Sequence, residues 1–218
     1  MGIEAAIVMI AFVLVAAALA FVVLNMGFST TQKAKSAVES STSEASSAME
    51  VAGSITGIGD ISTGVLNATI IPLKVASGGD SVNLNPNMTT IKYYSDSVRY
   101  DNIYKNSCLL TNSTYNNPTT ALDAAVTSGC ISAAPISGAA TEGAPSTTQA
   151  ILYWVLSSGS INGILQEGQD ANLAIVYKSA DRPQALDNIG VEVIGPTGSA
   201  LTVQRQVPSI TTEIIDLG

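Results

Sequence analysis

The sequence opens with a long segment that is apolar without interruption. Residues 5 to 24 carry no polar side chain, and Glu4 is the only charged residue in front of them. A helix rises 1.5 Å per residue, so this segment spans ~30 Å, the thickness of the hydrocarbon layer of a bilayer. From Gly27 onward the pattern changes to Ser, Thr, Gln and Lys mixed with apolar residues. The first segment is therefore long enough to cross a membrane.

The helical pattern continues beyond the apolar segment. No proline occurs between Gly27 and Ala52, and apolar residues recur three or four positions apart among polar ones, which predicts an amphipathic helix. Gly53, Gly57 and Gly59 follow as stop and hinge signals. We therefore predict one helix from Ile3 to about Ala52, within an N-terminal polymerisation domain of residues 1–55. The apolar positions of the amphipathic part are Ala34, Val38, Ala45, Ala48, Met49, Ala52 and Ile55.

Such a helix has no partner within its own chain large enough to cover it. Leaving its bulky side chains in water would cost at least ~20 kcal/mol, at roughly 1.5 kcal/mol each. Lipid can cover the apolar half, but the amphipathic half outside the membrane needs protein, and copies of the same helix satisfy both halves. A plain membrane span uses the same residue types. The residues expected to pack in a polymer are Ile3, Glu4, Ile7, Ile10, Phe12, Leu14, Ala17, Leu19, Phe21 and Leu24.

Glu4 has two interpretations. In a bundle its carboxylate would pair with the N-terminal amine of a neighbouring chain, because an unpaired charge at the apolar end is costly. Alternatively it is an exposed residue at a helix start, where the helix dipole favours a negative charge.

From about residue 61 the hydrophobic period changes to two, which predicts β structure. Apolar residues alternate on either side of Pro72, a bulge or edge position, and the turn at 196–199 joins two alternating segments into a hairpin. Further short strands are expected at 91–94, 151–156 and 173–177. Residues 56–218 are thus predicted to form an antiparallel β-sandwich, making the whole chain α+β. Within it, residues 106–149 form a loop-rich excursion with one short helix at 120–126.

The amino-acid composition excludes several classes of function. The net charge is −8, only 12% of residues are charged, and no cationic cluster exists, which argues against a nucleic-acid partner. The absence of His removes the usual general base and metal ligand, so we expect no enzymatic activity and no cofactor or metal. The run of Asp80, Asn83, Asn85 and Asn87 resembles a Ca²⁺ ligand set, but ordinary turn chemistry explains it better.

Two features place the β domain outside the cell. Cys108 and Cys130 are the only two cysteines and can form a disulfide, the alternative being two buried free thiols. Three sequons for N-glycosylation begin at Asn67, Asn87 and Asn112.

The charges beside the apolar segment indicate the opposite location for the β domain. Lys33 and Lys35 follow this segment, and the positive-inside rule would place the β domain in the cytoplasm. A removed basic leader would resolve the conflict.

Three segments resemble a known family. Residues 2–35, "GIEAAIVMIAFVLVAAALAFVVLNMGFSTTQKAK", look like the polymerisation helix of the archaellins, the type IV pilin-like filament subunits of the archaeal flagellum. The end of this segment, "NMGFSTTQKAK", resembles the crenarchaeal members of the family in particular. Residues 161–177, "INGILQEGQDANLAIVY", and 195–217, "GPTGSALTVQRQVPSITTEIIDL", resemble the late core strands and the closing hairpin and strand. The family's acidic residue usually lies fifth in the mature chain, whereas here it lies fourth.

The resemblance implies a function as well as a fold. The outer domain would be immunoglobulin-like, and a leader peptidase would process a precursor that inserts in the membrane. Assembly on a motor platform would then give an extracellular, rotating filament of identical, N-glycosylated subunits for swimming and surface adhesion. The alternatives are a subunit of a non-rotating adhesive pilus and, from another class, a bitopic cell-surface anchor.

Overall fold

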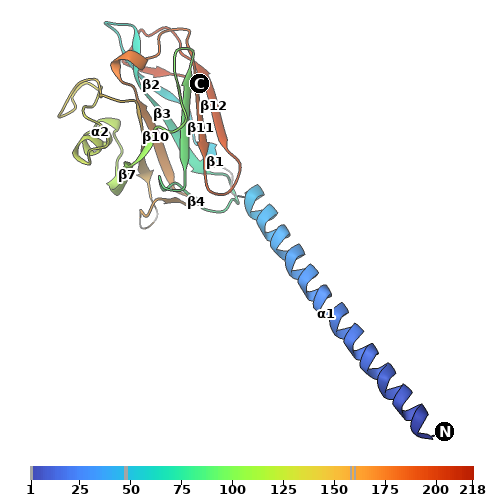
Figure 1. Cartoon of the computed structure of the whole chain (residues 1–218). Coiled ribbons are helices and arrows are strands. Elements are labelled where there is room, and N and C mark those ends of the chain that lie inside the picture. Colours follow the sequence, from blue (N-terminus) through green and yellow to red (C-terminus); the bar gives the residue numbers. More distant parts are fainter. Residues whose placement is uncertain (1, 47–48, 158, 160) are drawn as a thin grey trace. The chain divides into compact units, whose positions relative to one another are not determined.

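The computed structural model describes residues 2–46, 49–157, 159 and 161–218, and the chain divides into two units at Ser43 and Glu44. The first element is the helix α1, Gly2–Ser46 (Figure 1). It ends earlier than the predicted residue 52. Ala48 lies outside the described residues, and Met49 begins a strand. Serine and threonine occupy most positions before the helix end, and their helix propensity is low. Met49 then pairs with Val75 in a sheet, which replaces the helical hydrogen bonds.

The β domain, residues 49–218, contains two main sheets. The larger has seven strands in the order β13-β2-β3-β10-β8-β7, with β1 also paired to β3, and the smaller has the order β12-β11-β5-β6. A third, two-stranded pair joins β4 and β9. The strands are β1 (Met49–Val51), β2 (Thr56–Asp60), β3 (Val65–Val75), β4 (Val82–Asn83), β5 (Thr90–Ser95), β6 (Arg99–Tyr100), β7 (Tyr104–Thr114), β8 (Gln149–Leu156), β9 (Ile164–Leu165), β10 (Asp170–Val176), β11 (Asn188–Ile194), β12 (Leu201–Gln206) and β13 (Ile214–Asp216).

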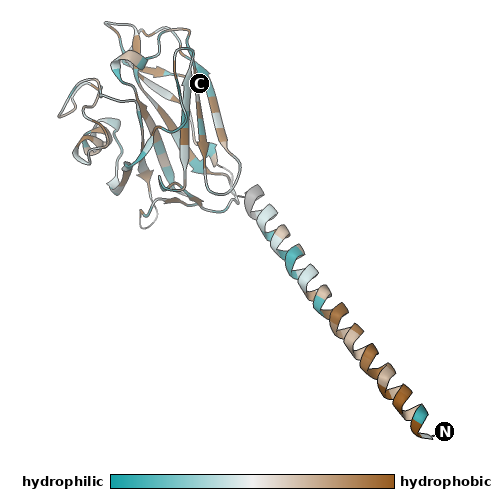
Figure 2. Ribbon diagram, viewed as in Figure 1, coloured by the Kyte–Doolittle hydropathy of each residue, from teal (hydrophilic) through white to brown (hydrophobic). Residues whose placement is uncertain are grey.

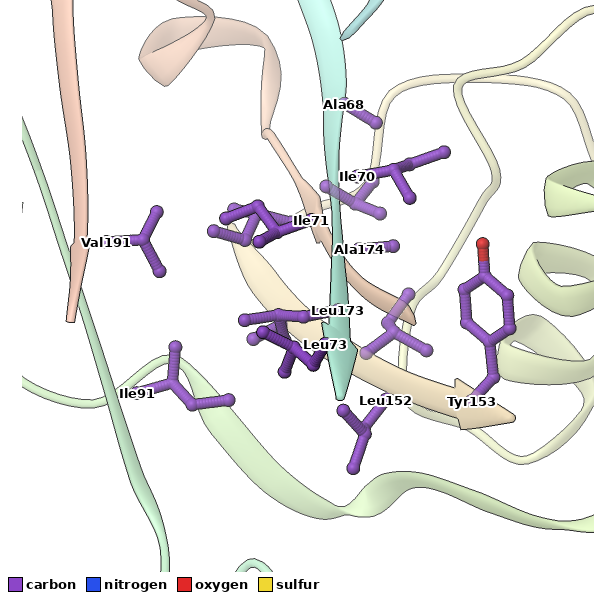
Figure 3. Packing of buried hydrophobic residues seen from close by; sticks show 14 of the residues in the cluster. Ala68, Ile70, Ile71, Leu73, Ile91, Leu152, Tyr153, Leu173, Ala174 and Val191 are labelled. Carbon is purple, nitrogen blue, oxygen red and sulfur yellow. The ribbon is translucent and has the colours of Figure 1, made fainter. Parts of the chain in front are cut away.

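The two main sheets pack face to face. Ile71, Leu73 and Leu173 of the larger sheet point toward Ile91 and Val191 of the smaller one (Figure 3). The opposite face of the larger sheet carries Ala68, Ile70 and Tyr153, which lie on the side of the helix α2, Pro118–Thr127. The larger sheet is thus buried on both faces, as its runs of consecutive buried residues in β3 and β8 require.

The prediction of a long helix followed by an antiparallel-rich sheet domain is confirmed. The hairpin of β11 and β12 pairs Val191 with Val203, and β5, β8 and β10 cover the short strands expected from the sequence. Among the described strands, β7 and β8 form a parallel pair. The isolated bridge between Ala134 and Glu142 is parallel as well.

Pro72 lies inside the larger sheet, not on an edge strand. Its carbonyl accepts a hydrogen bond from the Ala52 amide. In a strand the nitrogen and the carbonyl of one residue face the same side, so the Pro72 nitrogen also faces the segment between the end of β1 and the start of β2. A strand interior tolerates proline only where no ladder hydrogen bond is required. The gap between β1 and β2 supplies that position.

Gly57 and Gly59 are not hinges, because both belong to β2. A Cβ atom on Gly57 would lie 2.6 Å from a methyl carbon of Leu66, and one on Gly59 would lie 2.8 Å from a methyl carbon of Ile215. The glycines therefore leave room for core side chains. The same strand receives β13, which pairs Ile214 with Ile58.

The predicted loop-rich excursion at 106–149 is more ordered than expected. Residues 106–114 belong to β7, and α2 begins at Pro118, two residues before the predicted start. Asn117 caps this helix by accepting a hydrogen bond from the Thr119 amide. At its end the Ser128 hydroxyl donates to the carbonyl of Ser107, so the C-terminal end of α2 caps a carbonyl of the edge strand β7.

Candidate assembly helix and exposed sites of the β domain

The apolar part of α1 is exposed along its whole length. The large apolar side chains of the predicted assembly set are 60% to 79% exposed, and Ala17 is exposed as well. Figure 2 shows mostly hydrophobic residues along this part and more hydrophilic ones beyond it. By length and composition it is the one helix in the described part of the chain that could cross a membrane. The helix therefore presents an apolar surface that only another molecule or lipid can cover.

The assembly set divides into two faces. Seven members follow one another at alternating steps of four and three residues, which places them on one stripe of a helix. Phe12 and Leu19 lie almost opposite this stripe, since each residue turns the helix by about 100°. Bulky residues on two faces suit contact with more than one neighbour. The stripe consists of Ile3, Ile7, Ile10, Leu14, Ala17, Phe21 and Leu24.

Glu4 lies exposed in the first turn of α1. A carboxylate there is favoured by the helix dipole and is accessible to a partner, so both interpretations of this residue stand.

The described contacts of the polar half of α1 are local. The hydroxyls of Thr30 and Thr31 donate to the carbonyls of Met26 and Gly27, each at 2.8 Å, which satisfies these donors within the helix. Lys35 forms an exposed ion pair with Glu39, and such a pair adds little stability.

Cys108 of β7 and Cys130, which follows α2, form a disulfide. Both are buried. The bond closes a loop across 22 positions and ties the edge strand to the helix that covers it.

The three sequon asparagines have different surroundings. Asn87, in a turn, and Asn112, on the edge strand β7, are exposed. Asn67 lies within β3, is half-buried, and has a buried side-chain oxygen without a hydrogen-bond partner. The threonine of its sequon, Thr69, is buried, and so is Thr89 in the sequon of Asn87, so the exposure of the asparagine itself separates the sites. Access to Asn67 is therefore poorer than access to the other two.

The Asp80 to Asn87 run forms turns. The side-chain oxygen of Asn83 accepts the Asn85 amide at 2.9 Å, and that of Asn85 accepts the Asn87 amide at 3.2 Å. These are Asx turns. Among the described residues no group of three His, Cys, Asp or Glu side chains is arranged to hold a metal ion.

A buried carboxylate joins the two sheets. Asp181 is 3% exposed and accepts hydrogen bonds from the Tyr100 hydroxyl of β6 at 2.8 Å and from the Thr148 hydroxyl beside β8 at 2.7 Å. The ammonium of Lys178 lies 3.4 Å from the other carboxylate oxygen. The hydrogen bond with Tyr100, and then the charge of Asp181, raise the pKa of Lys178. This network fixes the smaller sheet against the larger one.

One turn of the β domain is strained. Residues 184–187 form a tight turn in which the Asp187 amide donates to the carbonyl of Gln184, and Leu186 has a φ of 75°. It is the non-glycine residue with positive φ in the described part of the chain. The third position of a type II turn normally takes Gly or Asn, and a leucine there costs on the order of 1 kcal/mol. Its side chain is nevertheless 70% exposed.

Sequence reasoning found the helix and the cysteine pair but missed the Asp181 network and the Leu186 turn. Neither carries a local signal, because the network joins residues up to 81 positions apart and the turn lacks a glycine.

The chain is similar in sequence to known proteins over most of its length. Residues 1–205 match the profile of a family described as archaeal-type flagellin. A probable flagellin 1 of Aeropyrum pernix is 35% identical over 211 residues, which covers 95% of this chain and 91% of that protein. A probable flagellin 1 of Archaeoglobus fulgidus is 40% identical over 90 residues, covering 41% of this chain and 44% of that protein.

Two solved structures share the fold. The archaeal flagellum of Methanospirillum hungatei matches with a TM-score of 0.62 and 22% identity, covering 99% of each chain. The crystal structure of the archaeal flagellin FlaB1 from Methanocaldococcus jannaschii matches with a TM-score of 0.58 and 14% identity, covering 78% of this chain and 95% of that one. At these identities the likeness shows the common fold.

Proposed function

Because this chain belongs to the archaeal-type flagellin family, we propose that it is a structural subunit of an archaeal flagellum and polymerises into a helical filament through α1. The exposed apolar surface of α1 is the observation that carries this proposal. The filament is an extracellular surface appendage that rotates for swimming. Surface adhesion is an additional role. The function is mechanical, not catalytic.

The energetics favour a membrane before assembly and a bundle afterwards. At roughly 1.5 kcal/mol for each large side chain, exposing the apolar part of α1 to water costs about 20 kcal/mol, so the free subunit resides in lipid. Transfer from lipid into a bundle yields no hydrophobic gain, because acyl chains are as apolar as leucine. Side-chain packing must therefore drive assembly. The stripe that begins at Ile3 meets one neighbouring helix, while Phe12 and Leu19 meet another.

We also propose the processing that such a subunit requires. A leader peptidase removes a basic leader from a precursor, which resolves the conflict between Lys33, Lys35 and an exterior β domain. The subunit then enters the filament at a motor platform in the membrane. The helix α1 acts in the filament core, and the β domain, residues 49–218, forms its outer layer. The predicted boundary at residue 55 lies too late, because β1 pairs with β3 and Ile55 is buried in the core of the β domain.

Glycans are expected at Asn87 and Asn112, whose exposure supports modification of the folded domain. Asn67 is half-buried and so would be modified only before β3 is complete. Intact-mass measurement of sheared filaments, with Asn87→Gln and Asn112→Gln as references, tests this assignment.

Shearing cells that express the chain tests the main proposal. A filament fraction made mostly of this chain, seen by electron microscopy, is the expected result. Retention of the chain in the membrane pellet, with no filaments, would refute polymerisation. Deleting the protein from the cells then separates the two roles. Loss of swimming supports a rotating filament, whereas loss of attachment with normal swimming supports an adhesive pilus.

A further inference from the structure

The strained Leu186 lies at the same end of the β domain as a second exposed apolar residue. Val65 pairs with Asp60 and also bridges Gln184, and the Leu66 amide donates to the carbonyl of Pro183. The segment through 184 therefore runs antiparallel to β3 and extends past its start, toward the β2–β3 turn. That turn carries Ile61, which is 59% exposed. We call Ile61 and Leu186 the apolar tip.

The opposite end of the same domain carries a second apolar pair. Met88 lies in the turn after β4, and Leu156 is the last residue of β8, where β8 meets the start of β10. Each is 55% exposed. In Figure 1 the small β4 strand lies at the end of the β domain away from the β2–β3 turn. We call Met88 and Leu156 the apolar base.

In the described part of the β domain, no side-chain contact explains why leucine occupies position 186. Glycine or asparagine would adopt the positive φ with less strain, and the leucine side chain is mostly exposed to solvent in the subunit. A residue that breaks a local rule without a compensating contact marks a functional constraint. An exposed leucine has one physical use that asparagine lacks, which is to be buried against another apolar surface.

We propose that the apolar tip of one subunit docks against the apolar base of a second copy of this chain. The inference rests on the proposed function, because a filament brings identical β domains together. Contacts in an open helical polymer are heterologous, joining two different patches of the same molecule. A tip and a base at opposite ends meet that requirement.

Leu186→Gly separates this role from a role in folding. In the full chain held in detergent micelles, glycine relieves the turn strain, so Tm is unchanged or rises by up to about 4 °C. In filaments the same variant loses a buried contact, and the unassembled subunit concentration should rise about tenfold. Leu186→Asn should behave in the same way, because asparagine also tolerates positive φ. If filaments of both variants are as stable as those of the parent chain, the inference is wrong.

A double cysteine variant tests the acceptor surface. Leu186→Cys combined with Met88→Cys, oxidised within sheared filaments, should give a ladder of linked subunits on a non-reducing gel, whereas each single variant gives none. The second double variant combines Leu186→Cys with Leu156→Cys. If both double variants form filaments but neither yields a ladder, the tip-to-base contact is wrong and the proposed function stays intact. Failure of the parent chain to form filaments would instead overturn the proposed function.

Discussion

Replacement of Asp181 should destabilise the β domain by removing the junction between its sheets. Asp181→Ala leaves the hydroxyls of the half-buried Tyr100 and the buried Thr148, which donate at 2.8 and 2.7 Å, without their acceptor. An unsatisfied buried donor costs about 1–3 kcal/mol, and Lys178 adds little because its side chain is one third exposed. We expect a loss of about 3 kcal/mol, which lowers Tm by roughly 6–12 °C for a domain of this size.

The single tryptophan provides the assay. Trp154 is fully buried in β8, so its fluorescence follows unfolding of the core without interference from α1. The full chain is measured in detergent micelles, with Asp101→Ala as the matched control, since Asp101 is exposed and its loss should change stability by less than about 0.5 kcal/mol. The loss of stability caused by Tyr100→Phe should lie between those of the two alanine variants, at about 1 kcal/mol. Equal Tm values for Asp181→Ala and Asp101→Ala would refute the reasoning.

Three further changes test the assembly helix, the disulfide and the buried tyrosines. Leu14→Lys places a charge in the apolar segment at a cost of about 3 kcal/mol, so filaments should disappear from the sheared fraction while Leu14→Met retains them. Replacing Cys108 and Cys130 together by serine should cost about 3 kcal/mol of unfolding free energy in a denaturant titration, and an unchanged midpoint would contradict the loop-closure argument. Burial raises the pKa of Tyr93 to about 12 and raises that of Tyr177 well above its ordinary value. Their neutral forms therefore stabilise the fold fully below pH ~10, the ordinary tyrosine pKa, and this stability is lost as pH rises to 12 and above. Tyrosinate absorbance from these two residues should appear only with unfolding, and its appearance in the folded protein at pH 10 would contradict their burial.

The elements that the sequence predicted well are those whose hydrophobic pattern is local. The apolar segment that starts at Ala5 cannot be anything but a helix in lipid or protein, and the alternation around Val191 and Val203 defines a hairpin by itself. The end of α1 was placed too late. The apolar spacing at Met49 and Ala52 suits both a helix and a strand, and the pairing with β3 decides between them.

Other elements depend on partners that are distant in sequence. The sequence of β2 predicts a glycine hinge. The true reason for Gly57 and Gly59 is the space that Leu66 and Ile215 need beside them, and this need depends on residues distant in the sequence. β7 reads as a polar loop because it is an edge strand whose outer side is covered by α2 and the disulfide. Its pairing with β8 is parallel and irregular, which no alternation in the sequence signals. The same limit applies to Asp181, since its partners come from both sheets.

The pairing of β13 with β2 has a consequence for biogenesis. Ile214 and Ile58 are 156 positions apart, so the edge of β2 stays open until nearly all the residues described here have been synthesised. Non-local pairing of this kind is slow, and an unpaired strand edge is a template for aggregation. A growing subunit whose α1 is already in lipid is tethered at the membrane and kept apart from nascent chains in solution. Membrane insertion would thus act as a holding step that protects the β domain until its last strand arrives.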